Sequence, residues 1–260
     1  MRRFQARPTD HEAAARISVE LGLHPVTAEI LARRNVLTPE QARRFLQPSA
    51  DQLHDPSRFR DMERATGELR EAIAKERSLA VYGDYDVDGV TGTAVLLRAL
   101  TALGANARPF IPHRVADGYG INPEALRRLR AEGVDVVVTV DNGTTRADAI
   151  ADAQAAGLHV IVTDHHEPAS TVPDCALINP KARGATYPFA GLAGCGVAFK
   201  LALGLAERMG RLRDPAFRRL LPDLMALVAM GTVADVVPLL DENRVLVSMG
   251  LQALSVTKHP

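Results

Sequence analysis

The chain has 260 residues, of which 47% are hydrophobic and 24% are charged, and its formal net charge is zero. This length and composition are typical of a globular protein with one large α/β domain or two smaller ones. Without a net positive charge, any binding to nucleic acid must depend on a local patch. The absence of Trp and the aromatic content of 4% argue against a broad platform for stacking bases.

The cysteines and the apolar runs bear on the compartment. Cys175 and Cys195 do not form a Cys-x-x-Cys pair, so the sequence indicates neither a disulfide framework nor a zinc site. No apolar run approaches the roughly 18 residues of a membrane span. We therefore expect a cytoplasmic protein without a membrane partner.

Residues 1–75 are expected to form a helical extension. Short helices are predicted at Leu21–Pro25, Thr27–Arg34 and Thr38–Leu46, and an amphipathic helix at Asp61–Arg77. The third short helix has the clearest start signal: Thr38 is a good N-cap, Pro39 takes the first helical position and Gln41 lies three residues after the cap. The extension leads into a second part, residues 76–260.

From Leu79 onward, short apolar runs alternate with helical segments. The predicted strands are Leu79–Tyr82, Arg108–Ile111, Val134–Val140, Leu158–Thr163 and Ala176–Ile178. The predicted helices are Val90–Leu103, Pro123–Glu132, Arg146–Ala156, Val197–Met209, Asp214–Val233 and Arg244–Leu254. This alternation predicts an α/β fold with a parallel β-sheet and helices on both faces. The chain stops soon after the last helix, which suggests a piece of a longer protein.

The first chemical motif, GDYDVDG at residues 83–89, directly follows the first predicted strand. If its backbone is extended, alternate residues face the same way, so Asp84, Asp86 and Asp88 would converge on one point. The alternatives are a polar turn or a calcium loop. An EF-hand would need a Glu at loop position 12, where this sequence has Val95. We therefore predict that the three carboxylates bind a metal.

Two further motifs follow the next predicted strands. Asp141 follows the most apolar strand, and Asp164-His165-His166 follows the strand after it. Ligands of parallel sheets bind outside the carboxyl ends of the strands, where these side chains would meet. We predict that Asp141 and His165 are metal ligands and that Asp164 orients an imidazole. His166 would meet the substrate phosphate or protonate a leaving group.

The remaining candidates come from the C-terminal part and from one loop. Asp235 is a carboxylate among apolar residues, and its burial would need a metal or an Arg as partner; we favour a metal. A glycine-rich segment precedes the helix that contains Lys200, and the N–H groups near Gly194 and Gly196 could hold a phosphate. Close packing explains these glycines equally well. Lys200 and Arg114 are further candidates for binding the substrate.

Carboxylates and an imidazole gathered at strand ends suit a pair of hard divalent ions, and such pairs hydrolyse phosphate esters. Taken together, the motifs resemble the DHH phosphoesterase superfamily, and within it the bacterial RecJ exonucleases. The similar segments are VYGDYDVDGVTGTA, VTVDNG, VIVTDHHEP, LAGCGVAFK and GTVADVVPL, with TPEQARRFLQPS near the N-terminus. Other members of the superfamily carry a His at the position of Tyr82. Tyr82 therefore favours the RecJ branch and makes Asp84 a candidate replacement ligand.

The resemblance implies a hydrolase: a 5′→3′ exonuclease for single-stranded DNA that acts in DNA recombination and repair and depends on two Mn²⁺ or Mg²⁺ ions. The implied ligands are Asp86, Asp88, Asp141, His165 and Asp235, with Asp84 as a further candidate and Asp141 as the first choice for a ligand shared by both ions. The implied partners are single-stranded DNA, single-strand-binding protein and a recombination helicase. Full RecJ proteins also have a DHH-associated domain and an OB-fold, and neither is visible in this sequence.

Two other functions remain open on the sequence. One is a phosphoesterase for small substrates, such as pyrophosphate or short oligonucleotides, and the helical extension together with Tyr82 argues against it. The other is a non-catalytic DNA-binding scaffold that keeps the fold, and the complete set of carboxylates and histidine argues against that.

Overall fold

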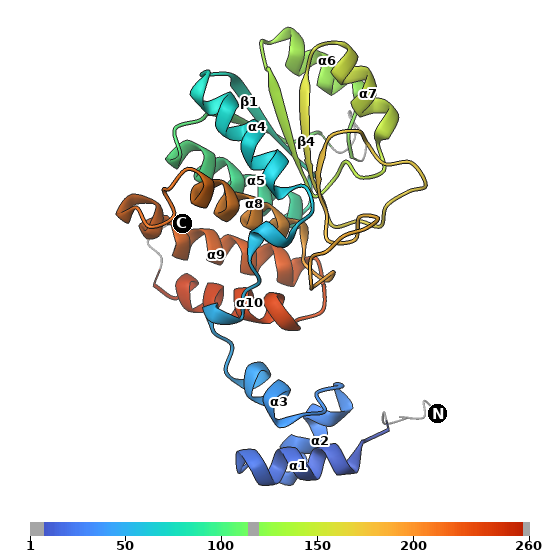
Figure 1. The fold of residues 1–260 in the computed structure, drawn as a ribbon, viewed down its shortest axis with the longest axis vertical. Coiled ribbons are helices and arrows are strands. Elements are labelled where there is room, and N and C mark those ends of the chain that lie inside the picture. Colours follow the sequence, from blue (N-terminus) through green and yellow to red (C-terminus); the bar gives the residue numbers. More distant parts are fainter. Residues whose placement is uncertain (1–7, 114–119, 257–260) are drawn as a thin grey trace. The chain divides into compact units, whose positions relative to one another are not determined.

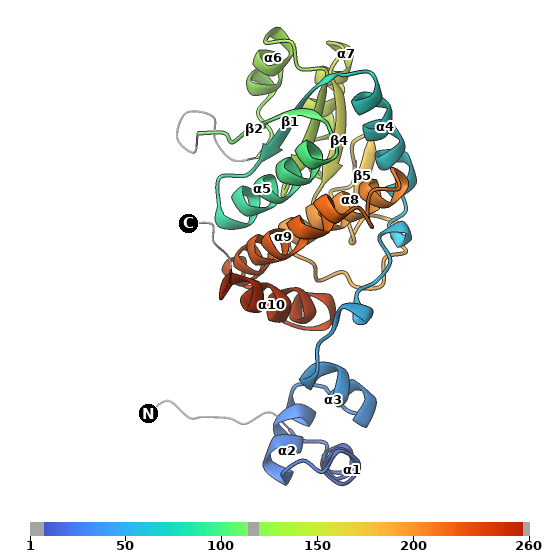
Figure 2. The ribbon, with the colours of Figure 1, turned by 90° about the vertical axis from the view of Figure 1, so that its left-hand side faces the viewer.

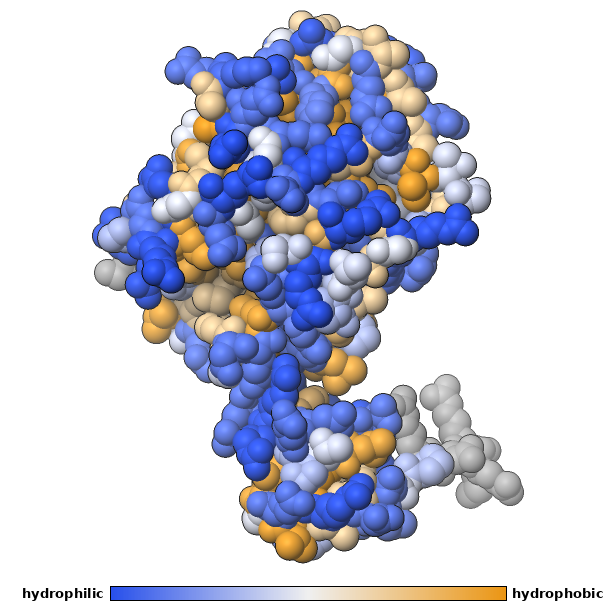
Figure 3. Space-filling view, in the orientation of Figure 1, coloured by the Kyte–Doolittle hydropathy of each residue, from blue (hydrophilic) through white to orange (hydrophobic). Residues whose placement is uncertain are grey.

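The computed structural model describes residues 8–113 and 120–256 of the chain. By its internal contacts the chain divides into two compact units, Met1–Leu53 and His54–Pro260 (Figure 1). The amphipathic helix predicted at Asp61–Arg77 forms as α4 (Met62–Ala74) and belongs to the second unit. In the view of Figure 3, hydrophilic residues cover most of the visible face of both units.

The first unit is built from α1 (His11–Leu21), α2 (Pro25–Arg33), α3 (Pro39–Leu46) and the short 3₁₀ helix η1 (Ala50–Gln52). The predicted start of α3 is confirmed, because Thr38 and Gln41 form a reciprocal capping box with Pro39 at the first helical position. The helix predicted at Leu21–Pro25 is wrong. There Gly22 adopts a left-handed conformation with φ 62°, ends the unpredicted α1 and turns the chain into α2.

The second unit contains the predicted parallel sheet. Its strands are β1 (Ser78–Gly83), β2 (Asn106–Phe110), β3 (Val136–Val140), β4 (His159–Thr163) and β5 (Ala176–Ile178). They pair in the order β2-β1-β3-β4-β5, and every pairing is parallel. The carboxyl ends of β1, β3 and β4 therefore lie next to one another at one edge of the sheet. This edge is where ligands bind in such folds.

Helices cover both faces of the sheet, as predicted. The helices are α4, α5 (Val87–Ala102), α6 (Pro123–Ala131), α7 (Ala147–Ala155), α8 (Gly194–Arg208), α9 (Pro215–Ala234) and α10 (Asp241–Leu254), with the short 3₁₀ helix η2 (Pro56–Arg58) before them. Figures 1 and 2 show α6 and α7 on one face and α4, α5 and α8 on the other. Side chains such as Val137 and Val160 pack with Leu126 and Ile150 in the core under α6 and α7. Such burial on both faces explains the unbroken apolar runs of the strands.

Two glycines allow α5, α8 and α9 to approach closely. A Cβ atom on Gly92 would lie 3.0 Å from the Cα of Cys195, and one on Gly231 would lie 2.3 Å from the Oγ1 of Thr91. The close packing brings the start of α8 and the end of α9 to the first turn of α5. Among the described residues, no helix combines the length and the apolar character that crossing a membrane requires.

Candidate metal centre

The segment between β1 and α5 carries the first three carboxylates. Asp86 is the N-cap of α5, and its Oδ1 accepts a hydrogen bond of 2.9 Å from the N–H of Gly89. Asp88 lies inside the first turn of the helix, which begins at Val87 and not at the predicted Val90. The three carboxylates therefore do not converge on one point as an extended segment would require. The early helix start divides them, so that Asp84 and Asp86 form one group with Asp141, and Asp88 joins another.

Asp88 accepts hydrogen bonds from the start of α8. Its Oδ2 accepts from the N–H of Gly194 at 2.6 Å, and its Oδ1 accepts from the N–H of Cys195 at 2.9 Å. A carboxylate at a helix N-terminus is stabilised by the unpaired N–H groups and the helix dipole. Because these donors already hold Asp88, the N–H of Gly194 does not serve as the predicted cradle for a substrate phosphate.

Asp141 follows β3 and is almost fully buried. Its backbone has φ 63°, a left-handed conformation that Asp tolerates better than most residues, and its N–H still bonds the carbonyl of Thr163. The Nε2 atom of His165 lies 3.0 Å from Oδ1 of Asp141, but the two lack the alignment of a hydrogen bond. This buried oxygen therefore has no hydrogen-bond partner.

Asp164 organises the two histidines that follow it. Its Oδ1 accepts from the backbone N–H groups of His165 and His166 at 2.7 and 3.1 Å, and its Oδ2 accepts from the N–H of Thr144 at 2.9 Å. The Nδ1 atom of His166 lies 2.8 Å from the same Oδ1. An ionised carboxylate can only accept, so Nδ1 of His166 carries the hydrogen.

The two histidines differ in where they lie. His165 is buried, with Nε2 3.0 Å from Asp141 and 3.7 Å from both Asp88 and Asp235. The side chain of His166 is 43% exposed, and its Nδ1 lies 3.8 Å from Oδ1 of Asp141. His165 therefore sits among the carboxylates, while His166 stands at their border with solvent.

Asp235 comes from a different element, the C-terminal end of α9, where it is the C-cap residue. Its Oδ2 is buried and has no hydrogen-bond partner. Among the described residues, three groups place ligand atoms within 4.8 Å of one another. They are Asp84 with Asp86 and Asp141, Asp88 with His165 and Asp235, and Asp141 with His165 and His166. Asp141 thus stands between a carboxylate group and a mixed carboxylate–histidine group.

The protonation behaviour follows from burial and crowding. Burial, followed by the charges of Asp88 and Asp86, raises the pKa of Asp141 to about 10. Burial also raises the pKa of Asp84 and of Asp235. Burial alone would raise the pKa of Asp164 as well, but the hydrogen bond and charge of His166 and the bonds from Thr144 lower it to about 2. The same hydrogen bond raises the pKa of His166.

Two of the predicted substrate contacts, Lys200 and Gly196, do not lie at this centre as expected. Lys200 is fully buried, forms an ion pair with the equally buried Glu242 and donates to the carbonyl of His54 at 2.6 Å, so it is not available to a substrate. A Cβ atom on Gly196 would lie 3.2 Å from Leu192, which indicates close packing of α8 against the segment that precedes it. Arg114 lies outside the described residues.

Two supporting residues, Asn179 and Thr144, were given no role by the sequence reasoning. Asn179, just after β5, donates from Nδ2 to Oγ1 of Thr144 and to the carbonyl of His166, each at 2.9 Å. Thr144 in turn holds Asp164. The Asn-Pro-Lys triplet after the last strand was the available signal. Tyr82, by contrast, is buried in the core under α6 and α7, and its hydroxyl donates to the carbonyl of Gly120 at 3.2 Å.

Comparison with known proteins gives the family. The family model described as "DHH family, N-terminal domain" matches residues 78–232, more than half of the chain. The chain belongs to the DHH family. This segment holds every strand of the sheet and the residues from Asp84 to His166 that form the centre.

Within the DHH family, the chain is similar to RecJ proteins. It is 40% identical over 258 residues to the single-stranded-DNA-specific exonuclease RecJ of Bacillus subtilis (strain 168), which covers 99% of the chain and 31% of that protein. The structure of RecJ in complex with Mn²⁺ from Thermus thermophilus matches with a TM-score of 0.78 and 32% identity. The match covers 98% of the present chain and 35% of the RecJ chain. An exonuclease RecJ bound to manganese matches with a TM-score of 0.67 and 40% identity, over 79% of the chain and 49% of that chain. The chain thus spans a third to a half of the length of these relatives.

Proposed function

We propose that this chain is the catalytic core of a metal-dependent hydrolase that removes nucleotides from single-stranded DNA in the 5′→3′ direction during recombination and repair. The single observation that carries the proposal is the oxygen pair Oδ1 of Asp141 and Oδ2 of Asp235. Both are buried without a hydrogen-bond partner, in a cluster whose carboxylates crowd one another. A buried carboxylate of this kind stays ionised only with compensating positive charge, and without it the group takes up a proton, as the raised pKa of Asp141 shows.

The donor set fits two hard divalent ions, Mn²⁺ or Mg²⁺. Asp84, Asp86 and Asp141 offer oxygen atoms to one ion. Asp88, His165 and Asp235 offer a mixed oxygen and nitrogen set to the other, as Mn²⁺ accepts. Asp141 belongs to the first set and approaches His165 of the second, so we assign it as the shared ligand. When bound, such ions supply a nucleophile at neutral pH and neutralise the charge that develops on the phosphoryl oxygens.

The protein contributes alignment and a proton. The carboxylate of Asp164 stays ionised and fixes the ring of His166 through Nδ1. This pairing keeps His166 protonated to a higher pH, at the exposed border of the cluster. There it can stabilise a phosphate oxygen or deliver a proton to the leaving oxygen. Backbone N–H groups hold two of the carboxylates in place, Asp88 from the start of α8 and Asp164 from Thr144.

The relatives support the choice of substrate. The Bacillus subtilis relative is described as specific for single-stranded DNA, and the two solved RecJ structures contain manganese. The two free, buried cysteines agree with the reducing cytoplasm that we propose as its compartment. We further propose single-strand-binding protein and a recombination helicase as partners, which co-purification with each protein would test.

The first test is hydrolysis of a 5′-phosphorylated, internally labelled single strand with and without Mn²⁺, beside a duplex and pyrophosphate. Release of mononucleotides from the single strand alone, only with Mn²⁺, is the expected result. Hydrolysis of pyrophosphate alone would replace the proposal with a small-substrate phosphoesterase. Tight Mn²⁺ binding without turnover of any of the three would show that this chain is not a sufficient catalytic core.

A pair of variants tests whether turnover depends on the metal centre. Asp141→Ala should lose both Mn²⁺-dependent hydrolysis and the thermal stabilisation by Mn²⁺, which at about 100 times the dissociation constant is about 2.7 kcal/mol. Asp152→Ala removes an exposed carboxylate from α7 and should keep both. Near-normal activity of Asp141→Ala would exclude Asp141 as the shared ligand.

A further inference from the structure

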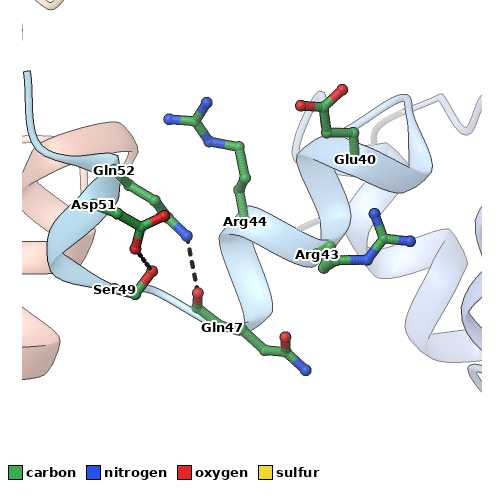
Figure 4. A pocket seen from close by; sticks show the side chains of 7 residues that line it. All are labelled: Glu40, Arg43, Arg44, Gln47, Ser49, Asp51 and Gln52. Atoms are coloured by element: carbon green, nitrogen blue, oxygen red, sulfur yellow. Dashed lines mark hydrogen bonds between the residues drawn. The ribbon is translucent and has the colours of Figure 1, made fainter.

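A polar cavity of about 390 Å³ lies within the first unit, apart in sequence from the residues of the metal centre. It is lined by the second half of α3 and the turn that contains η1: Glu40, Arg43, Arg44, Gln47, Ser49, Asp51 and Gln52 (Figure 4). Its volume falls within the range of ligand sites, about 300–1,000 Å³. No apolar residue lines it, so a hydrophobic ligand does not fit.

The two guanidinium groups of this cavity have no ion-pair or hydrogen-bond partner among the described residues. Elsewhere in the same unit, Arg16 pairs with Glu12 and Arg33 with Glu29. The two carboxylates of the cavity, Glu40 and Asp51, balance the formal charge of the two arginines. Asp51 accepts from the hydroxyl of Ser49, and Glu40 lies in the first turn of α3, where the helix dipole favours a negative charge. The guanidinium groups of Arg43 and Arg44 therefore keep their N–H donors for a bound anion.

Helix geometry shows what kind of anion can use both arginines. Consecutive helical residues do not face each other, and Figure 4 shows Arg43 and Arg44 leaving α3 in different directions. A single small anion cannot engage both groups. A chain of phosphates passing along the helix can engage one group after the other, and guanidinium suits phosphate because it offers parallel N–H donors.

The turn after α3 adds neutral donors to the site. Gln47 lies directly after the helix, and Gln52 donates from Nε2 to its carbonyl at 2.9 Å, which folds the turn back on the helix end. The amide group of Gln47 is exposed beside the arginines. Arginine and amide side chains together form the usual set of contacts to a nucleic-acid backbone.

We propose that this surface of α3, defined by Arg43, Arg44 and Gln47, binds the phosphate backbone of the single-stranded DNA substrate. The inference rests on the proposed function for the identity of the strand. It adds a binding site outside the metal centre, in a chain whose net charge of zero requires a local patch for such binding.

The test is the affinity of the chain for a fluorescent oligo-dT strand, measured without divalent metal over a range of KCl concentrations. Each phosphate contact contributes about 0.7 to the slope of log K against log salt for a single strand. The double variant Arg43→Gln/Arg44→Gln should lower the slope by about 1.4 and weaken binding about 25-fold near 0.1 M salt. Gln keeps the helix propensity of Arg, so α3 should remain folded.

The matched control is Arg16→Gln/Arg34→Gln, which removes the same charge from the same unit outside the cavity. Its slope should stay at the wild-type value. An equal loss in both double variants, an unchanged slope in the α3 variant, or no salt-dependent binding by the wild type would each overturn the site. The site would also be overturned if the two arginines were needed for binding polyglutamate but not for binding DNA. Mn²⁺-dependent hydrolysis of bis(p-nitrophenyl) phosphate by the wild type tests the metal centre separately, so failure of one proposal does not hide the other.

Discussion

The start of α8 makes a sharp prediction, because Gly194 touches the central carboxylate of the cluster. A Cβ atom on Gly194 would lie 2.7 Å from the Cβ of Asp141 and 2.8 Å from its Oδ1. Neither distance is tolerated, and Asp141 cannot swing away easily, since it is buried and its backbone is held in a left-handed turn. The N–H of Gly194 also holds Asp88. Gly194→Ala must therefore displace either Asp141 or the helix start.

The expected size of the effect has two parts. Inserting a methyl group into a packed site costs about 1–3 kcal/mol, while Ala in place of Gly in a helix gains up to about 1 kcal/mol. We expect a net loss of about 0–3 kcal/mol in the free energy of unfolding. The larger effect should be on Mn²⁺ affinity. Displacing a ligand or its immediate support typically costs about 10–100-fold in affinity.

Gly196→Ala is the matched control, two residues along the same helix. There the new Cβ atom would meet only the Cδ2 of Leu192, at 3.2 Å, and this is the flexible end of a side chain. Its stability should equal or slightly exceed that of the wild type, with unchanged Mn²⁺ affinity. Urea unfolding and calorimetric titration with Mn²⁺ would measure both quantities. If Gly194→Ala matched Gly196→Ala in both, the contact between α8 and Asp141 would have no role in the centre.

Three further outcomes follow from the structure. Lys200→Met should destabilise the protein by about 3–5 kcal/mol in urea unfolding because it leaves Glu242 buried and unpaired; if Lys200→Met/Glu242→Gln recovered none of this loss, the pair would not be its cause. Val236 has φ 60° and is 85% exposed. Val236→Gly should therefore relieve backbone strain of about 1–3 kcal/mol at an entropic cost of about 0.5–1 kcal/mol, which stabilises the protein. A lowered melting temperature of the variant would contradict this. Burial raises the folded-state pKa of Asp141 from 3.8 to about 10, so the metal-free protein should lose stability as pH rises between these values. Thermal unfolding of Asp141→Asn should lack that pH dependence, and a curve parallel to the wild type would assign it to another group.

The sheet and its order of elements followed from the sequence because local signals agreed with the fold. Unbroken apolar runs such as Val134–Val140 mark strands buried on both faces, and the five predicted strands overlap β1 to β5. The capping box at Thr38 was equally local and equally predictable. The helix α1 was missed although Asp10 caps it and Ala13, Ala14 and Ile17 form its buried face, because Gly22 was read as part of a helix that it ends.

The residues of the site also differ in how far local sequence signals could predict their roles. The positions of Asp141 and Asp164 after their strands are a matter of chain order, which the sequence displays. The role of the glycine-rich segment cannot be seen in the chain order, because it depends on contacts between residues more than a hundred positions apart, such as Gly194 and Asp88. Lys200 illustrates the limit: a basic residue near a glycine-rich helix start is typical of a phosphate site, and only the packing of α8 against Glu242 shows that it is buried.

The cluster also shows how the fold tolerates so many carboxylates in one place. Asp88 and Asp164 are each held by backbone N–H groups, from the start of α8 and from Thr144 and the histidines. Such bonds favour the charged form and fix the side chains before any ion arrives. Asp141 and Asp235 receive no equivalent support for their inward oxygens. The protein thus stabilises the carboxylates that build the frame and leaves one oxygen after β3 and one at the end of α9 uncompensated, where bound cations would supply the missing positive charge.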